Sequence, residues 1–305
     1  MDYAAAREIF FAKPEREAPA PPVAASAPSP ARRLRDAIEP LAVQAIFSPE
    51  GAARYAELGL DDFLAAYVWE RVAGLGTPTT PVVTAVLGVF SPGLIAELYE
   101  RGRDALSRDD VLAVRLSAPA VTVRRLLGGI DAEATRVVSV LRRGIAAADA
   151  TGRPLFAGLC GEPWPDDPLG QLVHACDLLR EHRGDSHLAV CVAACLDPVE
   201  MNVLTEQFCG YPLHAYTATR GWTQEQMDDA VTRLRARGLL AGATLSDRGL
   251  QFRAELEAQT DDLQRSVVEA IGRDLDRVVG QLARWSDLLV SLGGAPPDPA
   301  KRLAG

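Results

Sequence analysis

The sequence has no long hydrophobic run and no excess of basic side chains. None of its apolar stretches approaches the roughly 18 residues that a membrane-spanning helix needs, and the N-terminus lacks the basic start and apolar core of a signal peptide. The formal net charge of -9 works against non-specific binding to phosphate backbones or anionic lipid. We therefore expect a cytoplasmic protein that does not span a membrane.

Cysteines are few, and the motifs of several enzyme classes are missing. The 5 cysteines are an odd number scattered along the chain, which is typical of reduced thiols rather than of a disulfide framework. The sequence contains no Gly-x-Ser-x-Gly elbow, no phosphate-cradling glycine loop and no dinucleotide fingerprint. Cys191 and Cys195 lie among apolar neighbours, which favours core packing over nucleophilic catalysis. No cofactor can be named from the sequence.

Proline and alanine dominate the start of the chain. Residues 13–33 offer little to bury, and their prolines block helix formation, so we expect an extended tether. Ahead of the tether, Ile9, Phe10 and Phe11 stand side by side. We interpret residues 1–30 as a disordered tail. The alternative is a short helix that docks on this chain or on a protein partner.

From residue 31 onward, apolar residues recur at spacings of three and four, which predicts a mainly α protein. Residues 48–50, Ser-Pro-Glu, indicate a capped helix start, and residues 61–76 indicate a helix ended by glycines. Proline and glycine break residues 77–102 into short helices. Residues 107–129 predict a further pair of helices.

The second half of the chain repeats the order of the first. Residues 61–99 and 185–217 each begin with an acid and continue with an apolar helix, a proline break and a second apolar helix that ends in Phe. The identity between them is low, and such arrangements are frequent in all-α proteins. The pattern alone leaves both duplication and chance similarity open.

The clearest local pattern is a helix-turn-helix followed by a hairpin. Asp197 and Pro198 start one helix, and Thr223–Gln226 forms a capping box for the next, which stops at Gly238. Two short strands with a tight turn follow, and Ser246 caps a long helix. The buried stripe expected on the second helix comprises Met227, Ala230, Val231 and Leu234.

This stretch resembles the winged-helix domain of MarR-type transcription regulators. "RLRARGLL" matches the end of a recognition helix, and "LSDRGLQFRAELE" resembles the entry to the dimerisation helix. With "GRPLFAGL", "WPDDP", "LREHRGDSH" and "ATRGW", residues 31 to about 290 resemble an actinobacterial family of MarR-like helix-turn-helix proteins. The resemblance implies two winged-helix units in one chain that imitate the regulator dimer, and it implies no particular activity.

On this resemblance we divide the chain into three parts. Residues 1–30 are the tail, residues 31–159 a degraded winged-helix-like unit, and residues 160–305 a MarR-like winged-helix unit with long C-terminal helices. The expected fold class is mainly α, with two tandem winged-helix-like units that form an intrachain pseudo-dimer and a small β-wing in the second unit.

The recognition helix departs from that of a DNA reader. A DNA reader needs hydrogen-bond donors at the start of this helix and a basic wing for the phosphates. Here the helix opens with Glu225, Asp228 and Asp229, and the wing, residues 241–247, contains no Lys or Arg. The arginines within residues 233–237 are equally well explained as favourable charges at a helix C-terminus. DNA is therefore a disfavoured partner.

The segment "LREHRGDSH", residues 179–187, gathers two arginines, two acids and two histidines. It belongs to a helix expected from about residue 169 towards residue 184. One face of that helix comprises Leu172, Cys176, Leu179, Arg183 and Val190. Arg183 thus interrupts an apolar seam, and a buried guanidinium needs a carboxylate, carbonyls or an anionic ligand beside it.

Two interpretations of the segment stay open. Arg183 forms an ion pair that ties helices together, or it holds the carboxylate or phosphate of a ligand while His187 handles a proton. Three of the four histidines fall within fourteen residues, which favours a small polar or anionic ligand. Candidate ligand-binding residues are His174, Arg180, Glu181, His182, Arg183, Asp185, His187 and Trp222. Candidate catalytic residues are His187, His182 and Glu181.

Spacing also bears on metal and acid-base chemistry. No His-Glu-x-x-His pattern occurs, and a metal would need a ligand from elsewhere such as His214, so we assign no metal site. Glu181 and Asp185 share a helix face, where neighbouring carboxylates can raise a pKa or simply face solvent. Trp164 and Trp222 line a pocket or anchor the core.

The sequence best fits a small-molecule-binding protein derived from a MarR-type regulator, with weak or lost DNA binding. One alternative is an enzyme that uses the histidine, arginine and glutamate cluster for acid-base chemistry. The other is a ligand-responsive transcription regulator.

Overall fold

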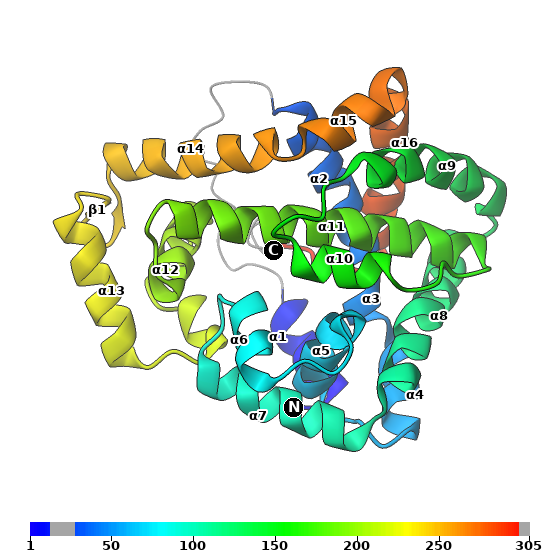
Figure 1. The fold of residues 1–305 in the computed structure, drawn as a ribbon, viewed down its shortest axis with the longest axis horizontal. Helices are drawn as coiled ribbons and strands as arrows, with labels where there is room; N and C mark the ends of the chain where they lie inside the picture. The colour runs from blue at the N-terminus through cyan, green and yellow to red at the C-terminus, as the bar shows by residue number, and fades with distance from the viewer. Residues whose placement is uncertain (13–27, 299–305) are drawn as a thin grey trace.

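The computed structural model describes residues 1–12 and 28–298, which fold almost entirely into helices (Figure 1). The α-helices are α1 (Tyr3–Phe10), α2 (Pro30–Ala42), α3 (Gln44–Phe47), α4 (Pro49–Glu57), α5 (Phe63–Val72), α6 (Thr80–Val86), α7 (Pro92–Ala105), α8 (Arg108–Leu127), α9 (Asp131–Ala147), α10 (Pro154–Cys160), α11 (Pro168–Ala193), α12 (Pro198–Phe208), α13 (Gln224–Ala236), α14 (Asp247–Asp262), α15 (Arg265–Ile271) and α16 (Leu275–Ser291). The short 3₁₀ helices are η1 (Ala73–Leu75), η2 (Thr217–Arg220) and η3 (Gly272–Asp274). The expectation of a mainly α protein is confirmed.

The only sheet in the described residues is a two-stranded hairpin. Strands β1 (Leu240–Ala241) and β2 (Thr244–Leu245) pair antiparallel, with Leu240 opposite Leu245. The hairpin stands where the small wing of the second half was expected. In the first half, α7 ends at Ala105 and α8 begins at Arg108, which leaves no room for a wing between them.

Helix α11 crosses the centre of the molecule, between α5–α7 on one side and α14 on the other (Figure 1). It packs against α2, α8, α9, α10 and α14. The largest hydrophobic cluster joins α11 to α2, α8, α9, α15 and α16. A second cluster lies mainly within α4–α8, and a third lies within the end of α11, α12, α13, β1 and α14. The long central helix thus connects two smaller helical groups.

The helix-turn-helix pattern is confirmed in detail. Capping boxes are present at Asp197 with Glu200 and at Thr223 with Gln226. The expected stripe on α13 is buried: it comprises Met227, Ala230, Val231 and Leu234. Ser246 caps α14, whose first turn passes so close to Leu239, the residue before β1, that a Cβ on Gly249 would lie 2.0 Å from its carbonyl oxygen. Only glycine fits at that position.

Two helix boundaries differ from the expected ones. Residues 107–129 form one helix rather than two, because packing of α8 against α4 and α11 compensates for the hydrogen bond that Pro119 cannot make. Helix α11 continues through Gly184 to Ala193. A helical glycine costs only about 1 kcal/mol, which burial of α11 on both sides of Gly184 outweighs.

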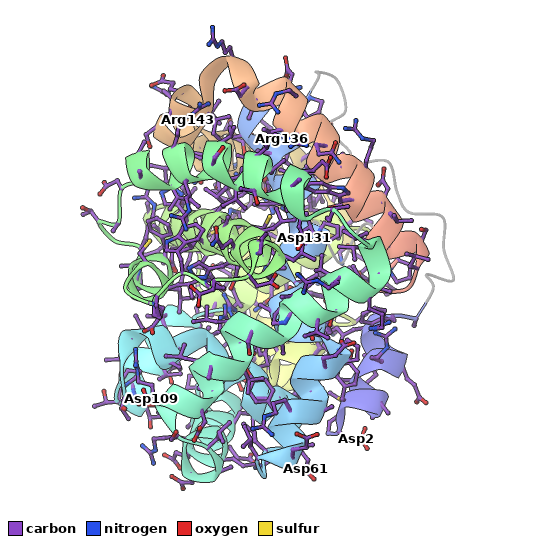
Figure 2. All side chains as sticks on the ribbon, turned by 90° about the vertical axis from the view of Figure 1, so that its right-hand side faces the viewer. Asp2, Asp61, Asp109, Asp131, Arg136 and Arg143 are labelled. Carbon is purple, nitrogen blue, oxygen red and sulfur yellow. The ribbon has the colours of Figure 1, made fainter. Side chains whose placement is uncertain are left out.

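The first twelve residues differ from the expected disordered tail. Helix α1 places Phe10 against the rings of Phe47 and Phe63, and Tyr3 donates a hydrogen bond to the carbonyl oxygen of Phe47. Asp2, just before α1, lies at the same end of the molecule as Asp61 (Figure 2). The docking helix considered as the alternative is therefore present on this chain. The tether at residues 13–27 lies outside the described residues.

Among the described helices, none is by itself long and apolar enough to cross a membrane. The bent pair of α11 and α12 meets both criteria only when the two helices are taken together.

Candidate functional site

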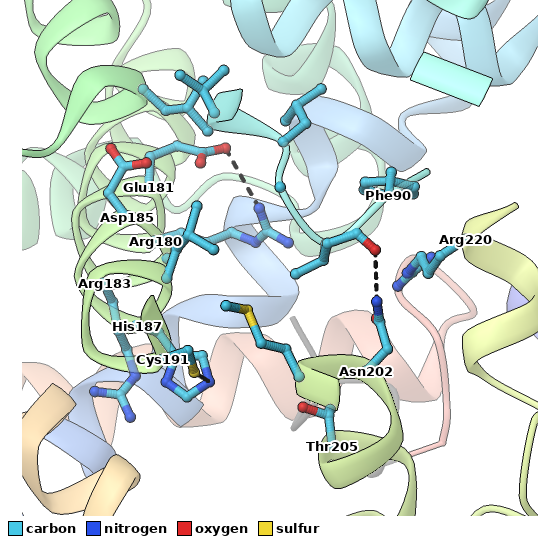
Figure 3. Close-up of a pocket in the computed structure, with 18 of the residues that line it drawn as sticks. Phe90, Arg180, Glu181, Arg183, Asp185, His187, Cys191, Asn202, Thr205 and Arg220 are labelled. Carbon is cyan, nitrogen blue, oxygen red and sulfur yellow. Dashed lines mark hydrogen bonds and ion pairs between the residues drawn. The ribbon is translucent and has the colours of Figure 1, made fainter. Parts of the chain in front are cut away.

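A cavity of about 190 Å³ opens beside the second half of α11 (Figure 3). Its walls come from α2, α5, α11, α12, α14, the segment between α6 and α7, and the connection that leads from α12 to α13. The arginines that line it are Arg32, Arg35, Arg71, Arg180, Arg183, Arg220 and Arg253, and the acids are Glu39, Glu181, Asp185 and Glu257. Positive side chains therefore outnumber negative ones in a chain whose net charge is -9.

The local sequence explains why α11 reaches the cavity as one rigid element. The carboxylate of Asp167 accepts hydrogen bonds from the amides of Leu169 and Gly170, and Pro168 occupies the first turn. Residues 179–187 are helical throughout, so their side chains point in several directions. Consequently only some of the charged and histidine side chains of residues 179–187 line the cavity.

Glu181 forms the tightest ion pair of the cavity wall. Arg71 binds it with two hydrogen bonds, at 3.0 Å and 2.6 Å, and Arg180 lies 3.5 Å from it. Burial would raise the pKa of Glu181, but the charges of Arg71 and Arg180 outweigh burial and lower it to about 2. Glu181 is therefore a fixed anion and unsuited to proton transfer near neutral pH.

Asp185, one turn further along α11, has the opposite electrostatic environment. Burial raises the pKa of Asp185 to about 7, although the backbone N–H of Phe156 donates a hydrogen bond to it over 3.0 Å. The two carboxylates expected on one helix face do line the same cavity. Asp185 is the one of the two that can exchange a proton near neutral pH.

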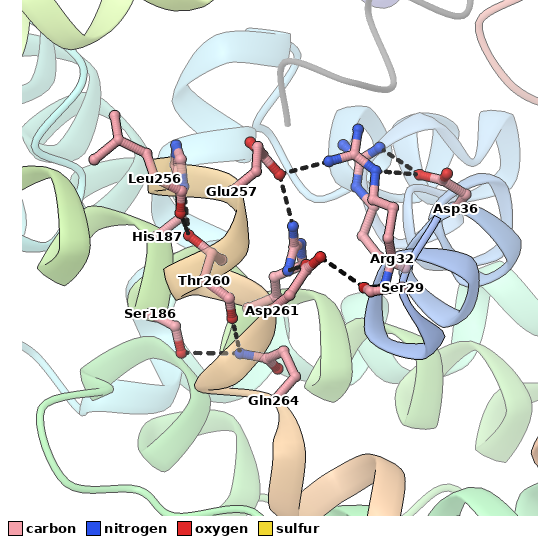
Figure 4. A network of polar contacts seen from close by, with 12 residues as sticks. Ser29, Arg32, Asp36, Ser186, His187, Leu256, Glu257, Thr260, Asp261 and Gln264 are labelled. Carbon is pink, nitrogen blue, oxygen red and sulfur yellow. Dashed lines mark hydrogen bonds and ion pairs between the residues drawn. The ribbon is translucent and has the colours of Figure 1, made fainter. Parts of the chain in front are cut away.

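Arg183 ties α11 to α14 through two carboxylates of α14, Glu257 and Asp261, which Figure 4 labels. Its guanidinium donates to Glu257 at 2.9 Å and to Asp261 at 2.7 Å, and only 11% of its side chain is exposed. Glu257 also pairs with Arg32 and Arg253. The observed contacts of Arg183 are therefore those of an ion pair that ties helices together. The residue also lines the cavity.

His187 lies at the edge of the cavity in a neutral hydrogen-bond chain. The hydroxyl of Thr260 donates to the carbonyl oxygen of Leu256, so it must accept from Nδ1 of His187, 2.9 Å away. Nε2 is left as an acceptor and faces the Cys191 thiol at 3.6 Å.

Burial keeps both groups of this pair neutral. Burial and the charge of Arg253 lower the pKa of His187 to about 3, and burial raises that of Cys191 to about 11. These contacts favour a structural role for His187 over proton transfer.

His182 does not line the cavity. It donates from Nδ1 to the amide oxygen of Gln264 at 2.6 Å, and its ring packs edge-on against Phe156. Gln264 in turn donates to Ser186 (Figure 4). The Ser186 hydroxyl also accepts from Arg153. His182 thus belongs to a buried network between α11 and the α14–α15 junction.

Two further candidates also lie elsewhere. His174 packs edge-on against Trp164, in the first half of α11, and burial lowers its pKa to about 4. Trp222 precedes α13 and donates its indole N–H to the carbonyl oxygen of Val89. The structure therefore gathers Arg180, Glu181, Arg183, Asp185 and His187 at the cavity and leaves His174, His182 and Trp222 outside it.

Sequence reasoning missed the cavity residues that come from other elements. The main ones are Arg32, Arg71, Asn202, Tyr216, Arg220 and Arg253. The only available signal was the string "ATRGW", which carries Arg220 but gives no indication of what faces it. The described residues contain no group of three His, Cys, Asp or Glu side chains arranged to hold a metal ion.

The exposed face of α13 is acidic, and its arginines are occupied. Glu225, Asp228 and Asp229 are exposed at the start of the helix. Arg233 pairs with Asp197, while Arg235 donates twice to the carbonyl oxygen of Gly242 in the wing. Arg237, the third arginine here, donates to the carbonyl oxygens at the end of α11.

Residues 31–296 match the model of a helix-turn-helix family. The chain therefore belongs to that family, which agrees with the α12–α13 unit and its hairpin. No curated protein and no solved structure matches the chain. Helix-turn-helix proteins commonly place the second helix in the major groove, so membership makes DNA a plausible partner.

Proposed function

We propose that this protein binds a small organic anion in the arginine-lined cavity, and that its affinity for DNA through α13 is weak. The observation that carries the proposal is the excess of arginines over carboxylates around one cavity of an acidic chain. Buried guanidinium groups cannot lose their charge, so such a cavity favours an anionic occupant.

We further propose that the chain descends from a MarR-type regulator whose two subunits have become one pseudo-dimeric chain. The separate hydrophobic clusters around α4–α8 and around α12–α14 support two units. The turns before α7 and before α13 lie against each other, because the backbone N–H of Ser91 donates to the carbonyl oxygen of Arg220 over 2.8 Å. None of the 5 cysteines forms a disulfide in the described residues, which fits the cytoplasmic location that we propose.

The binding test measures the melting temperature in the presence of small organic acids and their methyl esters. Acids should raise the melting temperature and esters should not, because a ligand that binds only the folded state stabilises it. Leu188→Trp should abolish the rise by filling the cavity, whereas Val192→Trp, at an exposed position of the same helix, should leave it intact. If no acid shifts the melting temperature, the proposal fails.

Weak DNA binding follows from the charges on α13. At about 50 mM salt the protein should not retard duplex DNA from the region upstream of its own coding sequence, because few free cations face the phosphates. Replacing Glu225, Asp228 and Asp229 together by Arg should create retardation that disappears at higher salt. Retardation by the unaltered protein, reversed by an organic acid, would instead favour a ligand-responsive transcription regulator.

An enzyme is the second candidate function, and one observation favours it. Glu181 and Asp185 line the same cavity, and their pKa values are about 2 and about 7. Two carboxyl groups whose pKa values differ in this way suit acid-base chemistry. In this alternative the proton is carried by Asp185 rather than by His187, His182 or Glu181. Turnover of a bound acid that disappears in Asp185→Asn while binding persists would support it. Unchanged recovery of the acid from the unaltered protein would exclude it for that compound.

A further inference from the structure

Arg220 differs from the other arginines that line the cavity. Each of the other six has a carboxylate within ion-pair distance: these arginines are Arg32, Arg35, Arg71, Arg180, Arg183 and Arg253. Among the described residues, no carboxylate pairs with Arg220. Arg220 is therefore the cavity arginine without a carboxylate partner in the described part of the chain.

The guanidinium of Arg220 is held in place without being neutralised. It lies 4.8 Å from the ring centre of Phe90 and 4.4 Å from that of Tyr216. One terminal nitrogen donates to the Tyr216 hydroxyl over 2.6 Å. Its Nε is buried and has no acceptor among the described residues. Because that Nε is buried and the terminal nitrogens are not among the buried atoms that lack a partner, a ligand oxyanion in the cavity would pair with the terminal nitrogens of Arg220.

Asn202 offers the opposite kind of group close to Arg220, because the two side chains contact the adjacent residues Val89 and Phe90 (Figure 3). Its side-chain NH₂ donates to the carbonyl oxygens of Val89 and Pro198, at 2.6 Å and 2.8 Å. These bonds use both hydrogens, so the amide oxygen is left as a hydrogen-bond acceptor. The residue lines the cavity, and its amide oxygen is not among the buried polar atoms that lack a partner, so a ligand in the cavity can reach that oxygen with a donor.

Part of the remaining cavity wall is apolar. Val86, Leu188 and Met201 line the cavity and carry no hydrogen-bonding side-chain groups that an anion could use. A ligand that fills the site therefore needs an acid group, a donor close to it and a hydrocarbon body.

We propose that the ligand is a hydroxy acid whose acid group binds Arg220 and whose hydroxyl donates to the amide oxygen of Asn202. This inference rests on the proposed anion-binding function and names the chemical class of the anion. A hydroxyl suits the site better than an ammonium group, because the surrounding arginines repel a second cation.

The test compares four probes by calorimetric titration of the full-length protein. The probes are 2-hydroxyhexanoate, hexanoate, 2-hydroxyhexanamide and 2-aminohexanoate. The hydroxy acid should bind most tightly, and loss of the hydroxyl or of the acid charge should each weaken binding about tenfold or more. The amino acid should bind more weakly than the hydroxy acid.

Arg220→Met tests the anchor, because methionine keeps an apolar stem against Phe90 and Tyr216 while it removes the charge. It should weaken 2-hydroxyhexanoate about tenfold or more. Arg103→Met is the matched control, since Arg103 also lies over an aromatic ring, that of Tyr99, but outside the cavity. The control should bind 2-hydroxyhexanoate as the unaltered protein does.

The outcomes separate this inference from the proposed function. If 2-hydroxyhexanoate binds and Arg220→Met does not weaken it, or if the amide binds as tightly as the acid, the inference is overturned while anion binding in the cavity stands. If no organic acid binds at all, both fail. Should Arg220→Met not fold, the comparison of acid with amide on the unaltered protein still decides the role of the charge.

Discussion

Glu181 and Asp185 show how strongly position determines the chemistry of one residue type. They are one turn apart on α11, yet Arg71 and Arg180 surround the first, while burial outweighs the backbone hydrogen bonds at the second. The pKa of Glu181 falls to about 2 and that of Asp185 rises to about 7. The same reasoning applies to His187, whose pKa falls to about 3 because burial and the charge of Arg253 oppose a second cation.

The raised pKa of Asp185 predicts a pH-dependent cost to stability. The folded protein keeps the proton that the unfolded chain releases above its ordinary pKa near 3.8. The stability that depends on a protonated Asp185 is fully present below about pH 4. It is lost as the pH rises through about 7. Asp185→Asn cannot ionise, so its stability relative to the unaltered protein should improve between pH 4 and pH 8 by on the order of 2 to 4 kcal/mol.

Urea unfolding of both proteins across that pH range measures the difference. Asp262→Asn, at an exposed position of α14, is the control and should show a constant difference. A constant difference for Asp185→Asn as well would mean that the carboxyl ionises equally easily in the folded and unfolded states.

At the scale of elements, close approach of helices sets the shape of the cavity walls. α5, which carries Arg71, packs against α7 through Gly102. A Cβ on Gly102 would lie 2.7 Å from the carbonyl oxygen of Ala65 and 2.8 Å from the Cβ of Trp69. Glycine at this position therefore allows a separation of the two helices that no other residue permits.

Gly102→Ala should destabilise the protein by about 1 to 3 kcal/mol, because the added methyl group overpacks the α5–α7 contact. Gly93→Ala lies on the same helix with nothing within 4 Å, so it should be neutral or stabilising by up to about 1 kcal/mol. Denaturant unfolding of the two variants makes the comparison. Equal stability of both would show that α5 and α7 can separate without cost.

At the scale of the whole molecule, the two ends of the described chain close the structure. Arg7 of α1 donates to the carbonyl oxygen of Gly293, and α2 packs along α16. Phe47 and Phe63 stack on each other beneath α1, and Ala295 joins the same apolar cluster. The N-terminal helix is therefore a cover for apolar surface as well as an end of the chain.

Deleting residues 1–12 should lower the melting temperature and increase binding of a hydrophobic dye, because Phe47 and Phe63 lose their cover. Ile9→Ala, at a side chain that is 53% exposed, should change neither quantity appreciably. If the deletion leaves both measurements unchanged, α1 does not protect the apolar cluster in solution.

The predictable part of the site was its α11 segment. Helical periodicity and the Asp167-Pro168 start identified the helix, and the buried guanidinium of Arg183 indicated a partner of opposite charge. The identity of that partner was not predictable, because Glu257 and Asp261 belong to α14, far along the chain. For the same reason the sequence grouped His182 with His187, although the first faces Gln264 and the second Thr260.

The sequence by itself determined the local elements: the capped starts of α12 and α13, the buried stripe of α13, the hairpin and the acidic recognition face. Capping, periodicity and turn chemistry act over a few residues, so they can be read along the chain. Only the tertiary structure decided which cavity arginines pair with carboxylates of the described residues and that Arg220 does not. Ion pairing and burial depend on which distant elements lie side by side, and the folded chain alone fixes that arrangement.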